Sequence, residues 1–423
     1  MISLFALAAA AALPTSAAVN SAPAQAVAIA ESAAPPAPAP EPAAAVFLSF
    51  DSTGAQQTRV ARGLLYRGSE RPVDADSLVR VASVSKLAVA LGVMRLVDQR
   101  RLDLDADVST YLGWQLRHPA YPERPITLAM LLSHRSGLAD SIDYVLPLDA
   151  DLEAELRRPE AWEAARRPGG GFRYANINYP VIAAAMEGAT GERFDRLMQR
   201  LVFQPLRIDA CFNWTTCSDT AVSRAVTLYR PTGEVARDDL NGQRPACPVV
   251  PARDGSCDLA TYRLARNGAS FSPQGGMRIS MRGLARLGEV LLRDGDRFVS
   301  RRSFHRMTRL QAVAEPESEG GLYCGYGLAV HSIGPARGDA ARWCRSDPFG
   351  DATPQIGHAG EAYSLRSGLF VDPVTGTGVA WFVTQQPEFN APLGARSIYT
   401  AAEEAMFAEA GLTGPRPVQP RRR

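Results

Sequence analysis

The chain has 423 residues, of which 46% are hydrophobic and 21% are charged, and this balance is typical of a globular protein. Its formal net charge of +2 is far from the basic balance of nucleic-acid-binding proteins, so no nucleic-acid partner is expected. The length is enough for two or three compact units with a sizeable buried core.

The first residues have the features of an export signal. Residues 2–13 are apolar, small-residue sites follow in residues 15–26, and the run is too short to span a bilayer. No lysine or arginine precedes the run, and a disordered alanine-rich leader is the alternative reading. We expect a signal peptide at 1–26, a Pro/Ala-rich linker at 27–45, a solvated tail at 413–423, and a periplasmic or secreted protein without a stable membrane span.

Strand patterns lie at both ends of the region 46–412, and helical patterns dominate between them up to about residue 310. Residues 44–50 and 56–65 read as two strands, and residues 363–372 and 379–384 as a hairpin. Residues 83–100 are apolar nearly all round, as in a buried helix, and a final helix stops at Gly411. These patterns predict an α+β fold, with one antiparallel sheet built from both chain ends, flanking helices, and an all-helical subdomain inserted at roughly 101–310.

Six cysteines fit an oxidising compartment. None belongs to a C-x-x-C pair, which argues against a structural zinc site, and we expect no metal and no cofactor. Proximity in the sequence favours the pairs Cys211–Cys217, Cys247–Cys257 and Cys324–Cys344, with a mixture of buried free thiols as the alternative.

Lys86 is the only lysine among 46 Lys and Arg residues, and it follows Ser83 by three positions at the start of the buried helix. This spacing places the two side chains one turn apart on one face. A serine hydroxyl becomes a nucleophile when a base takes its proton, and a buried amine can be that base whereas a guanidinium cannot. The pattern therefore predicts a nucleophile at Ser83 and its activator at Lys86. The alternative is a helix cap at Ser83 and a surface cation at Lys86.

The segment PGGGFRYANINYP, residues 168–180, carries Tyr174 and Asn176 as Y-x-N. A tyrosine near a lysine can relay a proton, and an asparagine amide can hold a substrate amide. Taken alone, Y-x-N is more often a packed tyrosine followed by a turn asparagine.

A third segment, IGHAGEAYSLRSGLF at 356–370, carries His358-Ala359-Gly360 at the start of an expected strand. Gly360 would let a substrate lie against the strand edge. The backbone N–H of Glu361 could then join that of Ser83 as a pair of donors to an oxyanion. Taken alone, a histidine before a strand is more often structural.

Together, S-x-x-K, YAN and HAG resemble the motifs of the serine β-lactamase and penicillin-binding-protein family. The closest likeness is to class C β-lactamases, D-alanyl-D-alanine carboxypeptidases and family VIII esterases, and it covers roughly residues 45–410. The resemblance implies a β-lactamase/transpeptidase-like fold with the site in a groove between sheet and helical subdomain. It further implies these roles: nucleophile, Ser83; activator, Lys86; general base and acid, Tyr174; substrate-amide contact, Asn176; third-motif group facing the substrate, His358.

The third motif departs from the family's KTG. A largely neutral histidine replaces the lysine, and Ala359 replaces the threonine, so recognition of a β-lactam or of a free C-terminal carboxylate is weakened. Arg366 is a candidate to compensate. The loop 211–257, with Phe212 and Trp214 expected to be exposed, either lines the groove or is a stapled surface loop.

These observations predict an exported serine hydrolase that cleaves an amide or ester through a Ser83 acyl-enzyme. A D-amino-acid peptidase, a carboxypeptidase or an esterase acting on a small molecule or peptide fits best. The alternatives are a β-lactamase and a non-catalytic penicillin-sensor protein on the same fold. His134 as a triad base is disfavoured, because residues 126–138 resemble a structural segment of the family.

Overall fold

The computed structural model describes residues 43–412, apart from residues 238, 313–320, 335–343 and 389. The expected signal peptide, nearly all of the expected linker and the expected tail lie outside the described residues. In the described ranges, no helix is both long enough and apolar enough to cross a membrane.

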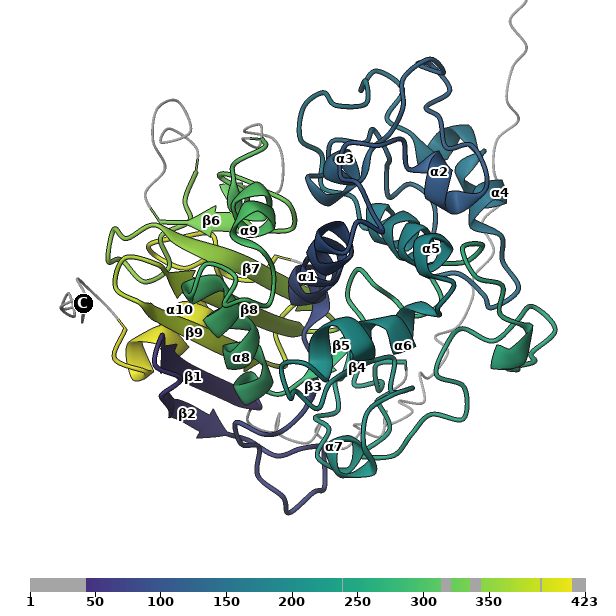
Figure 1. Ribbon diagram of the computed structural model, residues 1–423. Coiled ribbons are helices and arrows are strands. Elements are labelled where there is room, and N and C mark those ends of the chain that lie inside the picture. Colours follow the sequence, from purple (N-terminus) through teal and green to yellow (C-terminus); the bar gives the residue numbers. More distant parts are fainter. Residues whose placement is uncertain (1–42, 238, 313–320, 335–343, 389, 413–423) are drawn as a thin grey trace, which may run out of the picture. The chain divides into compact units, whose positions relative to one another are not determined.

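A six-stranded antiparallel sheet joins the two ends of the described chain (Figure 1). Its order is β2-β1-β9-β8-β7-β6, so β1 pairs with β9 across more than 300 residues of sequence. The predicted strands and the α+β class are confirmed. The strands are β1 (Ala45–Asp51), β2 (Gln56–Arg62), β6 (His331–Ile333), β7 (Gln355–Ala362), β8 (Leu365–Asp372) and β9 (Thr377–Val383).

Alternate residues of β1 face two separate apolar clusters, as the two-residue period of a strand requires. Val46 and Leu48 pack in the cluster that also contains α8 (Met281–Leu292). Phe47 faces the other way, where its ring contacts those of Trp381 and of Phe407 in α10 (Ala401–Glu409). The central sheet is therefore covered on both faces.

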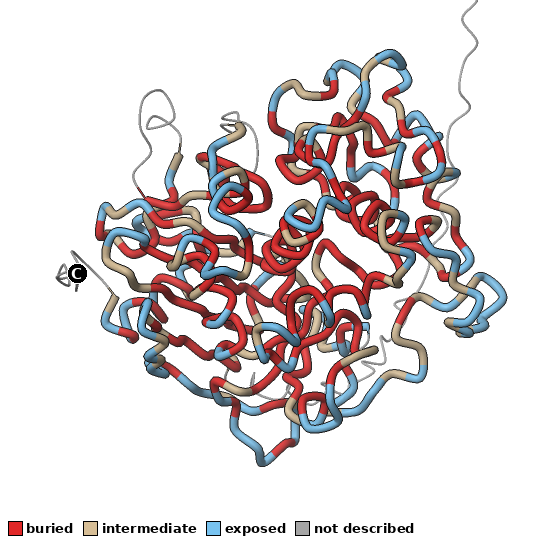
Figure 2. Tube along the Cα trace, in the orientation of Figure 1, coloured by how far each residue is buried: buried red, intermediate tan, exposed pale blue. Residues whose placement is uncertain are grey.

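Helix α1 (Ser85–Asp98) is buried along most of its length (Figure 2). It packs against the turn Ala82–Val84 that precedes it, β7, α9 (Arg301–Thr308) and the π-helical turn Gln199–Phe203. This packing on several sides explains why its sequence lacks a polar face, and the predicted buried helix is confirmed.

The part of the chain between β2 and β6 contains further helices and a small sheet. The helices are α2 (Ser109–Leu112), α3 (Leu128–Leu132), α4 (Leu152–Leu156), α5 (Asn178–Thr190), α6 (Phe194–Met198) and α7 (Asp219–Ser223). The sheet has the order β3-β5-β4, from β3 (Val79–Arg80), β5 (Met277–Ile279) and β4 (Cys211–Phe212). The expectation of helices alone at 101–310 misses β4 and β5, because strands of two or three residues are too short to show an alternating pattern.

The three predicted disulfides, Cys211–Cys217, Cys247–Cys257 and Cys324–Cys344, are confirmed. The expected exposure of Phe212 and Trp214 is wrong, since these side chains are 0% and 1% exposed. Phe212 packs against Phe194 and Phe203, and Trp214 lies in the apolar cluster around the first disulfide.

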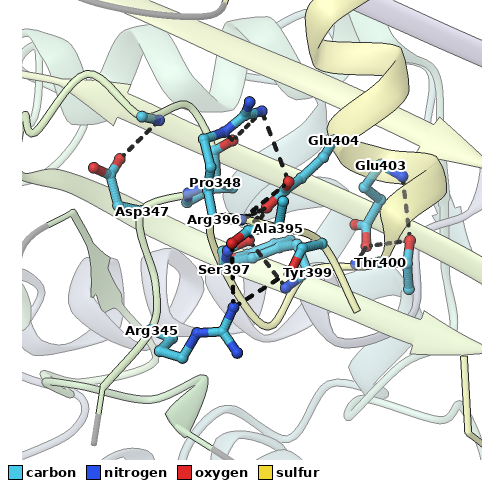
Figure 3. Close-up of polar contacts among 12 residues, drawn as sticks. Arg345, Asp347, Pro348, Ala395, Arg396, Ser397, Tyr399, Thr400, Glu403 and Glu404 are labelled. Atoms are coloured by element: carbon cyan, nitrogen blue, oxygen red, sulfur yellow. Dashed lines mark hydrogen bonds and ion pairs between the residues drawn. The ribbon is translucent and has the colours of Figure 1, made fainter. Parts of the chain in front are cut away.

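The start of α10 is held by a dense set of hydrogen bonds (Figure 3). Thr400 and Glu403 form a reciprocal capping box. The carboxylate of Glu404 accepts hydrogen bonds from the backbone N–H groups of Arg396 and Ser397 and from the Ser397 hydroxyl. These contacts fix the segment that leads into α10. This segment lines a cavity that also contains Ser83 in its wall.

The carboxyl of Glu187, in α5, should make the stability of the protein depend on pH. It accepts hydrogen bonds from Phe194 N, Ala265 N and the Tyr262 hydroxyl, and burial raises its pKa from 4.5 to about 7. Because the folded-state pKa lies above the unfolded one, the stabilisation is complete below about pH 4.5 and is lost as the pH rises through about 7. The loss should amount to about 3 kcal/mol in the free energy of unfolding.

The measurement is denaturant unfolding of the wild type and of Glu187→Gln at about pH 5 and about pH 8. The difference in stability between the two proteins should shift toward the glutamine variant at the higher pH. Glu192→Gln, at a more exposed position of the adjacent loop, is the matched control. An equal difference at both pH values would contradict the prediction.

Candidate active site

Ser83 lies in the single turn Ala82–Val84 that connects β3 to α1. Ala82 has φ +45°, in the left-handed region that non-glycine residues rarely adopt. Such a conformation persists where the surroundings enforce it, and it is often found at functional sites. Neither this turn nor α1 has a side-chain cap, so the alternative interpretation of Ser83 as a helix cap is wrong.

The Lys86 side chain is completely buried, which rules out the surface-cation alternative. Its Nζ lies 2.9 Å from Ser83 Oγ, 2.9 Å from Asn176 Oδ1 and 2.8 Å from the backbone oxygen of Gln274. An ammonium can donate to all three oxygens. A neutral amine can donate to the two carbonyl oxygens and accept the hydroxyl proton of Ser83, so the same partners satisfy both protonation states.

Tyr174 is a second neighbour of Ser83. Its hydroxyl lies 2.9 Å from Ser83 Oγ. Its ring is stacked between those of His134, at 4.3 Å, and Tyr323, at 4.7 Å. The Ser83 oxygen is therefore within hydrogen-bond distance of both an amine and a phenol. Stacking holds the phenol ring in place, and the side chain that carries the amine is buried.

His134 is a structural residue of this cluster. Its Nδ1 accepts the backbone N–H of Ala175 at 3.0 Å, and burial together with nearby Lys86 lowers its pKa well below the usual value. Its neutral ring stacks on the Tyr174 ring. A triad base would have to contact Ser83, and His134 does not.

Asn176 is oriented by Asp140, a residue that the sequence did not reveal. One carboxylate oxygen of Asp140 accepts from the backbone N–H of Asn176 at 2.7 Å and from its Nδ2 at 3.0 Å. The other accepts from Ile177 N at 2.9 Å, just before α5. Because Nδ2 faces the carboxylate, Oδ1 faces Lys86. The contact spans 36 residues, and no local sequence pattern announces it.

His358 differs from its expected position facing the substrate. Its side chain is completely buried, its Nε2 lies 2.9 Å from the Tyr326 hydroxyl, and it lines neither of the cavities beside Ser83. Burial, with nearby His331 and Lys86, lowers its pKa well below the usual value. The HAG segment lies in the interior of β7 (Gln355–Ala362) rather than at its start, and the packed Tyr326 covers the imidazole.

Gly360 lies where β7 passes closest to the Ser83 turn. A Cβ at this position would lie 2.4 Å from Val81 O, 2.5 Å from Ser367 Oγ and 3.2 Å from Ser83 N. Only glycine allows this approach without displacement of the turn. The neighbouring backbone N–H of Glu361 as a second oxyanion donor stays a prediction.

Two cavities meet at Ser83. The first, of about 720 Å³, and the second, of about 470 Å³, are both lined by Ser83 and Asn176. Gly360, Ala359 and the segment before α10 line the second cavity. The loop 211–257 lines the first through Asn213, Arg230, Arg237 and residues 247–251. The loop is therefore part of the site wall. Among the described residues, no group of three or more His, Cys, Asp or Glu is placed to hold a metal ion.

The family model described as Beta-lactamase matches residues 48–403. The chain belongs to the Beta-lactamase family. The predicted resemblance is thereby confirmed, and with it the β-lactamase/transpeptidase-like fold.

Several known proteins are similar to this chain in sequence. Esterase EstB of Burkholderia gladioli is 36% identical over 36% of this chain and 43% of its own length. Penicillin-binding protein 4 of Amycolatopsis lactamdurans is 31% identical over 39% of this chain and 42% of its own length. The D-alanyl-D-alanine-carboxypeptidase/endopeptidase AmpH of Escherichia coli (strain K12) is 29% identical over 41% of this chain and 42% of its own length. The chain thus spans less than half the length of these relatives.

Solved structures support the fold. The octameric penicillin-binding protein homologue from Pyrococcus abyssi superposes with a TM-score of 0.62, 20% identity, and coverage of 89% of this chain and 76% of that chain. The D-amino acid amidase from Ochrobactrum anthropi SV3 superposes with a TM-score of 0.60, 18% identity, and coverage of 87% and 93%.

Loss of the Asp140 carboxylate should impair catalysis through Asn176. Asp140→Ala leaves Nδ2 and the backbone N–H of Asn176 without their acceptor, so Oδ1 loses its fixed orientation toward Lys86. We expect kcat to fall about tenfold to a hundredfold, from the cost of unmade hydrogen bonds to a charged group. We also expect the pH profile of kcat/KM to shift, because an acceptor of the Lys86 amine is disturbed. Asp254→Ala, at an exposed turn, is the control, and an unchanged pH profile in Asp140→Ala would contradict the positioning role.

Proposed function

We propose that this protein is an exported serine hydrolase that cleaves an ester or amide through an acyl-enzyme formed on Ser83. One observation carries the proposal. The Ser83 oxygen lies 2.9 Å from both the buried Lys86 amine and the Tyr174 hydroxyl, so its proton has two routes away and the oxygen faces two cavities. The names of the related esterase and carboxypeptidase agree with this chemistry.

The reaction begins when the Ser83 hydroxyl attacks the carbonyl carbon and its proton passes to the coupled Lys86–Tyr174 pair. Because these groups interact with the same oxygen, they titrate as a unit, and the proton belongs to the pair rather than to either residue. The backbone N–H groups of Ser83 and Glu361 hold the oxyanion. Tyr174 returns a proton to the leaving group, and water releases the acyl group.

Asn176 is proposed to contact a substrate amide through the Nδ2 proton that Asp140 does not take. This role is compatible with its orientation, since Oδ1 is occupied by Lys86 and one Nδ2 hydrogen by Asp140. His358 is not proposed to touch the substrate, because its ring is buried against Tyr326.

The proposed substrate is an ester or a D-amino-acid amide or peptide rather than a β-lactam. The lysine and threonine of KTG are absent from the third motif, and His358 does not reach the cavities. Export is supported by the apolar N-terminal sequence and by the three disulfides. An esterase or D-peptidase of the cell envelope or medium is therefore the function that fits best.

The third prediction concerns Ser83 and Lys86. Ser83→Ala should reduce turnover of p-nitrophenyl acetate by about 10⁴-fold or more, as expected for loss of a nucleophile. Lys86→Arg keeps the positive charge but cannot accept a proton at neutral pH, so it should be nearly as damaging. Circular dichroism checks that both variants fold. An active arginine variant would reject the neutral-amine role.

A chromogenic cephalosporin, assayed beside the ester, separates the alternatives. Turnover of the ester alone supports an esterase, and turnover of the cephalosporin supports a β-lactamase. Stable acylation of Ser83 without turnover supports a sensor protein. Failure of both compounds to label Ser83 in mass spectrometry would count against the whole mechanism.

A further inference from the structure

The first cavity beside Ser83 contains charged and polar side chains that the proposed mechanism does not use. We propose that this cavity binds a carboxylate, or a comparable anionic group, of the substrate. The inference rests on the proposed function and adds the substrate's charge and the place where that charge is recognised.

The arginine content of the two cavities differs. Arg80, Arg230 and Arg237 line the first cavity but not the second. Among the described lining residues, Asp143 is the acidic residue that belongs to the first cavity alone. The second cavity has no arginine of its own in this set, but it has Asp140 and Glu403. The charged residues that belong to the first cavity alone, three arginines and one aspartate, are therefore net positive, which favours an anion on this side of Ser83.

The charged residues shared by both cavities do not cancel this difference. Glu361 forms an ion pair with Arg366 at 2.8 Å, so these two charges offset each other. Glu388 is shared as well and adds the same charge to both sides. The contrast between the cavities comes from the unshared residues.

Two of the arginines are held at one aromatic ring. The guanidinium carbons of Arg80 and Arg230 lie 5.0 Å and 4.9 Å from the ring centre of Tyr363. Tyr363 lies at the tight turn between β7 and β8, where its φ is +50° and that of Ser364 is +57°. The ring at this turn thus has two like charges beside it at one cavity, an arrangement that an anionic ligand would stabilise.

A second, independent observation also points to a ligand. Ser270 and Gln274 line this cavity and are only 2% and 6% exposed. Ser270 Oγ and Gln274 Oε1 have no hydrogen-bond partner among the described residues. Leaving buried polar atoms unpaired is costly, and a polar ligand in the cavity would satisfy them.

Gln274 connects this cavity to the reaction centre. Its backbone oxygen accepts a hydrogen bond from Lys86 Nζ, while its side chain borders the cavity. The residue that carries the unpaired Oε1 therefore borders both the reaction centre and the proposed anion site. The cavity volume of about 720 Å³ is large enough for a substrate arm that carries an amide and a carboxylate.

The experiment compares matched esters that differ in one charge. On the acyl side, the p-nitrophenyl esters of adipate, its mono-methyl ester and 6-aminohexanoate end in a carboxylate, a neutral ester and an ammonium. On the leaving-group side, 3-acetoxybenzoate is compared with its methyl ester. The quantity measured is kcat/KM, with the rate of the Ser83→Ala protein subtracted.

We expect the carboxylate to be preferred about tenfold or more in one of the two series, the size expected for a hydrogen bond to a charged group. The series that shows the preference identifies which part of the substrate occupies the first cavity. Arg230→Gln should remove most of that preference and change the rate of the neutral ester much less. Arg230→Lys should retain part of it, and Arg237→Gln gives a second measurement from another position.

Arg301→Gln is the matched control, because it removes the same charge from a side chain that is 81% exposed on α9. Equal rates for carboxylate and neutral esters in both series, or a preference for the ammonium, would overturn the inference while ester turnover still supports the proposed hydrolase. Absence of Ser83-dependent turnover with every ester would overturn both.

Discussion

The geometry of this site depends on the hydrogen bonds around the buried amine of Lys86. A charged group without solvent is costly unless several oxygens surround it, and three do so here. They come from the turn before α1, from the segment before α5 and from the segment before β5. Displacing any one of these segments would leave the buried amine short of a hydrogen-bond partner, so the amine fixes their relative positions.

The surroundings of the amine keep other positive charges away from it. His134 and His358 are both buried nearby, and their pKa values lie well below the usual range partly because of Lys86 itself. Both rings are therefore neutral at physiological pH. On the proposed mechanism, Lys86 therefore exchanges its proton with Ser83 and Tyr174 in a cluster of neutral rings, where the low local dielectric strengthens each charge interaction.

What the sequence predicted correctly depends on short-range relations. The S-x-x-K spacing, the buried helix α1, the strands of the main sheet other than β6 and the three disulfides all follow from residues close together in the chain. Apart from the short strands β4 and β5, two misses are long-range. Asp140 reaches Asn176 across 36 residues, and the burial of Phe212 depends on packing against Phe194 and Phe203. No local pattern encodes such contacts, because the tertiary fold creates them.

The third motif shows why a pattern can be right about position and wrong about a side chain. His358 and Gly360 are two residues apart in β7, so both point to the same face of the sheet, toward the Ser83 turn. The glycine meets that turn directly, where its missing side chain lets two backbones approach. The histidine lies one step further along the strand, where Tyr326 covers it. The strand therefore acts on the site through its backbone. On our proposal, recognition of substrate charge passes to arginines outside this strand, namely Arg80 in β3 and Arg230 and Arg237 in the disulfide-bonded loop 211–257.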